Sequence, residues 1–227
     1  MRKLLSFKKR LKLVFCFILL IIYAFHIPCA HAEQTDIKYT SVLKFCSGIV
    51  VAFSVHELSH AFVAEITNTK IRWEAGTYNQ PIGFTEYADS DLKGFSLNSA
   101  GLLSQAIGSE IVLRRDGINK NSPFVQGFMT WNILNPIMYS LDYWLFHVTN
   151  KEDSYGYQGD LEGIEHYSNE ATAHGFAFSA TALAVFQGYR FLKTQDWAPD
   201  WVKSESQNMS LEPKPSGGVL LKYKIHF

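Results

Sequence analysis

The sequence predicts a mainly α-helical protein, a membrane-embedded bundle of about four helices with a small β-hairpin-like insertion. Long apolar segments at residues 41–66, 95–113, 123–148 and 171–192, separated by polar turns, predict the helices. Two of these segments are rich in small residues, which allow membrane helices to pack closely. The stretch after the first segment alternates apolar and polar residues, as a short strand does, and predicts the insertion.

The N-terminal residues 1–32 are predicted to be a signal peptide or a signal anchor. They contain six basic residues and no acidic residue, and an apolar run follows the basic region. Ala30 and Ala32 form a small-residue pattern that suits signal-peptide cleavage, and an uncleaved anchor helix is the alternative. We expect residues 33–194 to form the membrane core and residues 195–227 a C-terminal tail that ends in one strand.

The charge and the cysteine content exclude two classes of protein. Beyond its basic N-terminus the chain is net acidic, so a surface for nucleic acid is not expected. The three cysteines do not indicate a disulfide framework. We expect Cys46, in the first apolar segment, to behave as a small buried apolar residue.

The first apolar segment carries the HExxH motif His56-Glu57-Leu58-Ser59-His60, and it is long enough to cross a bilayer. On a helix, residues four apart share a face, so His56 and His60 can take two corners of a tetrahedral zinc site. Glu57 lies on an adjoining face, where it can take a proton from metal-activated water and later donate it to a leaving amine. The alternative is a helix whose histidines are satisfied by hydrogen bonds.

The elements that follow the motif can be placed in order. Residues 71–76 and 84–87, joined by a turn, are expected to pair as the hairpin. Pro123 suits the first position of the third long helix, where its missing N–H costs nothing. Within that segment Asn135 and Pro136 should break helix hydrogen bonding locally, which could free the Asn135 amide to hold an extended peptide. Asn135 is therefore a candidate substrate-binding residue.

A catalytic zinc site needs a third protein ligand, and three carboxylates are candidates. Asp142, in the third apolar segment, would be costly to bury without a partner such as a metal; otherwise it is an interfacial carboxylate near a helix end. Asp160 could begin the fourth long helix and point back at the site, or could simply cap that helix. Glu86 would suit a soluble thermolysin-like protease, although a solvated loop acid is preferred for it. We expect His174 to be a hydrogen-bonded core histidine.

Three segments of the chain resemble the site-2-protease-type membrane zinc metalloproteases. The sequence HELSHA at residues 56–61 is similar to that family's HExxH on a membrane helix, and SAGLLSQ at residues 99–105 looks like its small-residue helix. The Asn-Pro pair at residues 135–136, followed by Leu-Asp at residues 141–142, resembles its Asn-Pro and Leu-Asp-Gly segment. The resemblance covers about residues 41–148, and the hairpin after the first motif also fits it.

This resemblance implies a zinc-dependent intramembrane endopeptidase. It implies that His56 and His60 are metal ligands, that Asp142 is the third ligand, and that Glu57 is the general base; Asp160 stays open as the alternative third ligand. The implied partners are a membrane-associated polypeptide, which is the substrate, and the lipid bilayer. The chain is expected to cross a membrane several times, and the bacterial inner membrane is the expected location.

Two other functions remain open at the level of the sequence. One is a non-proteolytic membrane scaffold or chaperone-like protein with a residual metal site. The intact Glu57 favours an enzyme over this function, because a structural zinc site has no need of a base. The other is an exported soluble zinc protease that uses Glu86 as its third ligand.

Overall fold

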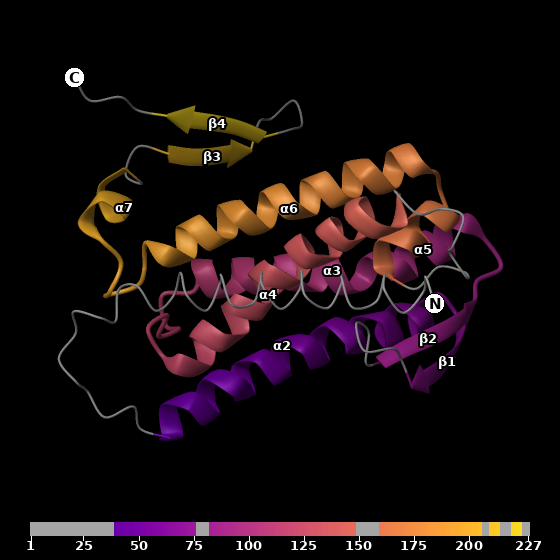
Figure 1. Cartoon of the computed structure of the whole chain (residues 1–227), viewed down its shortest axis with the longest axis horizontal. Coiled ribbons are helices and arrows are strands. Elements are labelled where there is room, and N and C mark those ends of the chain that lie inside the picture. The colour runs from indigo at the N-terminus through magenta and orange to yellow at the C-terminus, as the bar shows by residue number, and fades with distance from the viewer. Residues whose placement is uncertain (1–38, 76–81, 149–158, 206–208, 214–218, 224–227) are drawn as a thin grey trace, which may run out of the picture. The chain divides into compact units, whose positions relative to one another are not determined.

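The structure is a computed structural model, and it describes residues 39–75, 82–148, 159–205, 209–213 and 219–223 (Figure 1). The chain divides into a unit that ends at Lys38 and a unit that begins at Tyr39, and the described elements belong to the second. The predicted signal peptide or anchor, residues 1–32, lies outside the described residues. The second unit is mainly helical, as predicted.

Four long helices correspond to the four apolar segments. They are α2 (Tyr39–Ile66), α3 (Asp91–Arg114), α4 (Pro123–Asp142) and α6 (Glu170–Leu192). Helix α2 packs against α3 and α4, and α6 packs against the same two helices. Figure 1 shows α3 and α4 between α2 and α6. The predicted number of long helices is therefore confirmed.

Three shorter helical pieces complete the helical part of the described chain. They are the π-helix η2 (Tyr143–His147), α5 (Asp160–His166) and α7 (Asp200–Glu205). The third apolar segment therefore changes from an α-helix to a π-helix at Tyr143. The expectation that Asp160 begins the fourth long helix was wrong, because Asp160 begins α5, a separate helix that packs against α3 and α6.

Helix α4 shows how local sequence sets the limits of an element. The Ser122 side chain accepts a hydrogen bond from the Val125 N–H, and Pro123 occupies the first turn, as predicted. The helix then continues through Pro136 to Asp142, so the hydrogen bond that Pro136 cannot make does not interrupt the helix. Ser140 donates its hydroxyl to the Pro136 carbonyl at 2.9 Å, one turn beyond the proline.

Helices α2 and α4 cross with their backbones in direct contact. A Cβ atom at Gly48 would collide with the backbone of Phe124 and Phe128. At the same crossing, a Cβ atom at Gly127 would collide with the backbone of Phe45. Each glycine therefore makes room for the other helix, as small residues do between membrane helices.

The predicted hairpin is confirmed. Strands β1 (Lys70–Ala75) and β2 (Ile82–Tyr87) pair antiparallel, with Lys70 opposite Tyr87. A second hairpin lies in the tail, where β3 (Met209–Pro213) pairs with β4 (Val219–Tyr223). Strand β4 is the one predicted at the end of the chain, whereas β3 was not predicted.

A buried apolar cluster joins α3, η2, α5 and α6. Its members are Leu102, Tyr143, Leu161, Ile164, Ala173 and Ala177. This cluster is the reason why the short helix α5 has a defined place in the fold.

Among the helices that the structure describes, α2 is the one long and apolar enough to cross a membrane, over Thr40–Ile66. The outer face of α2 carries large exposed apolar side chains such as Val50, Leu58 and Phe62. Cys46 is exposed on this helix, so the expectation that it is buried was wrong.

Candidate metal centre

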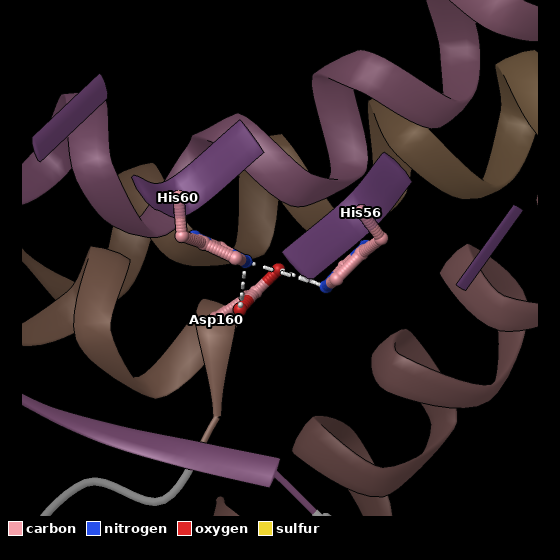
Figure 2. A group of neighbouring side chains, drawn as sticks. All are labelled: His56, His60 and Asp160. Carbon is pink, nitrogen blue, oxygen red and sulfur yellow. Dashed lines mark hydrogen bonds and ion pairs between the residues drawn. The ribbon is translucent and has the colours of Figure 1, made fainter. Parts of the chain in front are cut away.

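Two histidines and one aspartate meet inside the bundle. His56 and His60 come from α2 and Asp160 comes from α5, and their exposed fractions are 2%, 1% and 5% (Figure 2). The two Nε2 atoms of the histidines lie 3.3 Å apart. His56 Nε2 lies 3.4 Å from Asp160 Oδ2, and His60 Nε2 lies 3.5 Å from Asp160 Oδ1. Three potential metal ligands therefore point at one place.

Each element brings its ligand to the site for a local reason. The histidines are four residues apart on an unbroken helix, so their side chains lie on one face, as the motif predicts. Asp160 is the first residue of α5, directly after the extended residue Gly159. The following residues Leu161 and Ile164 are buried in the apolar cluster, so α5 is oriented with its first residue toward α2.

A backbone carbonyl fixes the tautomer of His60. Its Nδ1 lies 2.7 Å from the carbonyl oxygen of Leu97 on α3. A carbonyl only accepts hydrogen bonds, so Nδ1 must carry the hydrogen and the neutral ring presents the Nε2 lone pair to Asp160 and His56. Metal-bound histidines commonly donate their other ring N–H in this way.

Gly101 on α3 forms one wall of the site. A Cβ atom there would collide with the ring of His56, and it would lie 2.6 Å from His60 Nε2. Any residue other than glycine would therefore occupy the space between the imidazoles. The close approach of α3 to the motif depends on this one position.

A polar chain extends from the site toward α4. Gln105 lies beside the His56 ring, although no hydrogen bond to His56 Nδ1 is formed. The half-buried Asn135 donates from Nδ2 to Gln105 Oε1 at 3.1 Å. The Asn135 amide, predicted to bind substrate, is thus engaged with α3 through Gln105.

Glu57 lies at the edge of the site. It is half-buried, whereas both neighbouring histidines of the motif are buried. Its charge interacts with His60 and with Asp160. The position beside the ligands and partly open to the outside suits a residue that exchanges protons with water or substrate.

The site has an excess of acidic groups. Burial raises the pKa of Asp160 well above its usual range, and the nearby Glu86 carboxylate raises it further. Glu86 on β2 is buried as well, and its Oε1 accepts a hydrogen bond from Asn98 Nδ2 at 2.8 Å. A divalent cation between the histidines and Asp160 would compensate this charge.

The three predicted carboxylates differ in their positions. Asp160, the alternative third ligand, is the carboxylate that joins the histidines. Asp142 ends α4 and is exposed, because the neighbouring Tyr143 occupies the buried face of the chain at that point; it is not part of the three-residue group. Glu86 is buried beside the site rather than in solvent, so the preference for a solvated loop acid was wrong.

His174 lies on α6, outside the three-residue group. Its Nδ1 accepts a hydrogen bond from Trp144 Nε1 at 3.0 Å, so it is hydrogen-bonded as predicted. Its side chain is 38% exposed, so it is not a core histidine in the strict sense.

Several residues of the site were not found by sequence reasoning. The Leu97 carbonyl that orients His60 and the Asn98 amide that holds Glu86 belong to no motif. Gly101 lies in the small-residue helix, but the sequence does not say which of its small residues faces the histidines. Their roles depend on the register between α2 and α3, which only the folded structure supplies.

The spacing of the two histidine nitrogens suits tetrahedral zinc coordination, and the Asp160 carboxylate lies beside both. Two ligand atoms at the usual zinc distances of roughly 2.0–2.1 Å, at a tetrahedral angle, are about 3.3–3.4 Å apart. The two Nε2 atoms of the histidines are 3.3 Å apart, and each lies 3.4 or 3.5 Å from an Asp160 oxygen, a different oxygen for each histidine. Two histidines and one carboxylate also leave a fourth position open, as in catalytic zinc sites. The residues present therefore fit a zinc ion.

Comparisons with known proteins do not place the chain in a family. No protein-family model matches it, and neither the curated proteins nor the solved structures contain a match. The function of the protein is therefore inferred from its own residues and their geometry.

Proposed function

We propose that the protein is a zinc-dependent intramembrane endopeptidase in which His56, His60 and Asp160 hold the metal and Glu57 is the general base. The observation that carries this proposal is the buried group itself: the two imidazole Nε2 atoms lie 3.3 Å apart, and each lies within 3.5 Å of a carboxylate oxygen of Asp160. The presence of Glu57 beside those ligands favours a catalytic site over a structural one.

Zinc held by these residues would supply Lewis acidity, which polarises a peptide carbonyl and lowers the pKa of water. A carboxylate oxygen of Glu57 accepts a proton from the water molecule whose oxygen attacks the peptide carbonyl carbon. It then gives that proton to the nitrogen of the leaving amine as the C–N bond breaks. The Leu97 carbonyl keeps His60 in the tautomer that the metal requires throughout.

The outer face of α2 supports a location in the membrane. No exposed position between Lys44 and Glu65 carries a charged residue. These two residues are separated by about 31 Å of helix, which matches a hydrocarbon thickness of about 30 Å. Ser47 and Ser54 donate their hydroxyls to the carbonyls four residues before them, at 2.7 and 2.8 Å, so they need no water.

The other long helices carry uncharged stretches of similar length. Helices α3, α4 and α6 contain no Asp, Glu, Lys or Arg over residues 94–109, 123–141 and 171–189. Each stretch corresponds to about 24–28 Å of helix, close to the thickness of a bilayer core. These stretches support a bundle that crosses the membrane several times, with a membrane-associated polypeptide as its substrate.

The zinc content of the detergent-purified protein tests the metal site. Wild type and Asp142→Ala should hold about one zinc per chain, while His56→Ala and Asp160→Ala should hold none. Asp142→Ala is the matched control, because it removes an aspartate that lies outside the three-residue group. Absence of zinc from the reconstituted wild type would refute the proposal.

Glu57→Gln tests whether the site is catalytic. This variant should keep its zinc and lose turnover by about 10²-fold or more, measured on a library of quenched fluorescent peptides with apolar sequences. Equal turnover in wild type and Glu57→Gln would remove the assigned base. Zinc binding without any turnover in wild type would instead favour the non-proteolytic scaffold.

A further inference from the structure

Of the three grouped residues, Asp160 is the one that lies outside the HExxH motif, and the short helix α5 carries it. It spans Asp160–His166, and isolated helices shorter than about 12 residues are marginal in water. The position of Asp160 must therefore be set by what α5 packs against.

One side of α5 is held by apolar packing. Leu161 and Ile164 are 2% and 0% exposed and belong to the cluster with α3, η2 and α6. Gly163 lies so close to the side chain of Asn98 on α3 that a Cβ atom there would collide with it. This packing fixes how close α5 lies to α3, but apolar contacts are not directional.

The other side of α5 carries two acidic residues that face one imidazole. His147 Nδ1 lies 3.3 Å from Glu162 Oε1, and His147 Nε2 lies 3.1 Å from Glu165 Oε2. The side chains of His147, Glu162 and Glu165 are 13%, 16% and 20% exposed, so the ion pairs are largely shielded from solvent. Each ring nitrogen faces a different carboxylate, so one imidazole links Glu162 to Glu165.

The π-helix η2 presents this imidazole together with a second donor. Tyr143 donates its hydroxyl to Glu165 Oε2 at 2.5 Å, and its ring stacks on His147 with centroids 5.3 Å apart. Both residues therefore face α5 from η2. π-Helical turns are frequent at functional sites, where they redirect side chains.

We propose that His147 is a positioning residue for the metal centre: it joins Glu162 and Glu165 of α5 to η2 and so holds Asp160 against the two histidines of α2. This inference rests on the proposed zinc site. Unlike the apolar packing, the two ion pairs on opposite ring nitrogens resist rotation of α5 about its own axis, and such a rotation would carry Asp160 away from the histidines.

The test compares His147→Leu with His174→Leu in detergent-purified full-length protein loaded with Co²⁺. His174 is the matched control, because it also contacts the Tyr143 ring but belongs to α6 and pairs with Glu170 of its own helix. We expect His147→Leu to weaken Co²⁺ binding by roughly 10–100-fold, as residues that support metal ligands do, and to change the visible Co²⁺ spectrum. His174→Leu should keep the Co²⁺ affinity and the visible Co²⁺ spectrum of the wild type.

Amide hydrogen exchange over residues 160–166 gives a second measurement that needs no metal. Exchange there should be faster in His147→Leu than in wild type and in His174→Leu. Wild-type metal affinity together with wild-type exchange in His147→Leu would overturn the inference, as would equal losses in both variants. Absence of metal from wild type would refute the zinc site, whereas the exchange data would still decide whether His147 holds α5. If His147→Leu does not fold, Glu165→Gln is measured in its place, with the same expectations.

Discussion

At the scale of single residues, Asp160 is both a ligand of the proposed metal centre and a buried titratable group of the metal-free protein. Its pKa is raised by burial and by Glu86, so the folded metal-free protein holds a proton that the unfolded chain releases above pH of about 4. The metal-free protein should therefore lose stability as the pH rises from that value. Bound zinc would instead favour the ionised form of Asp160, because a carboxylate must be ionised to serve as a metal ligand.

Asp160→Asn separates these two effects. In EDTA the variant should be at least as stable as wild type at pH 7, and its melting temperature should depend less on pH, because the buried ionisable group is gone. Added zinc should raise the melting temperature of wild type and of Asp142→Asn, but not that of Asp160→Asn. A zinc-dependent rise in Asp160→Asn would show that another group serves as the third ligand.

Gly101→Ala tests how closely α3 approaches the site. The added methyl group would occupy the space between His56 and His60, so zinc should be lost and the melting temperature should fall. Gly175→Ala on α6 is the control, since a Cβ atom there meets nothing within 4 Å. The control should be neutral or stabilising by up to about 1 kcal/mol. Full zinc occupancy in Gly101→Ala would contradict this description of the wall.

At the scale of the elements, Glu110 joins α3 to α6. It accepts hydrogen bonds from Arg114 at 2.5 Å and from Arg190 at 2.7 Å. Burial alone would raise the pKa of Glu110, but these hydrogen bonds outweigh burial and lower it. The link therefore stabilises the fold when the pH is above the ordinary glutamate pKa of about 4.3. This stabilisation is lost as the pH falls through the lower pKa that Glu110 has in the folded protein.

Glu110→Gln should lower the melting temperature at pH 7, and the difference from wild type should shrink when the pH is lowered below about 4. Thermal unfolding, monitored by circular dichroism from pH 7 to below about pH 4, measures this difference in melting temperature. Asp89→Asn removes an ion pair in which the aspartate is 72% exposed, and it should change little at any pH. A pH-independent effect of Glu110→Gln would mean that packing, not charge, explains the loss.

The elements also show what the sequence can and cannot predict. Helix periodicity and the turn residues predicted the four long helices, the first hairpin and the pairing of His56 with His60 on one face. Helix α5 was not separated from α6, because a helix of this length depends on tertiary contacts more than on local preference. The choice between Asp142 and Asp160 depends on which face of each helix turns inward, and each was a reasonable candidate from its sequence position alone.

At the scale of the whole molecule, the uncharged outer face of α2 defines where lipid would contact the protein. Leu58→Lys places a charge within that face, about 10 Å of helix from Glu65 and about 21 Å from Lys44, where Leu58 is 65% exposed. A charge at the centre of a bilayer costs roughly 2.5–3.5 kcal/mol on insertion scales, so less protein should resist extraction of membranes by alkaline carbonate.

Leu92→Lys is the matched control for that variant. Leu92 is 75% exposed near the start of α3, outside the charge-free stretch at residues 94–109. The Leu92→Lys variant should remain in the membrane fraction as the wild type does. Equal extraction of wild type, Leu58→Lys and Leu92→Lys would argue that the α2 face does not contact lipid.

The distance in sequence between the ligands has a consequence for biosynthesis. The HExxH helix is made early, but Asp160 follows His60 only after α3, α4 and η2 have been synthesised. Two imidazoles alone leave a zinc site open, so a ribosome-bound chain that ends before α5 cannot close it. If the proposed site holds zinc, the nascent protein can acquire that metal, and with it the capacity to cut other polypeptides, only after most of the bundle has been made.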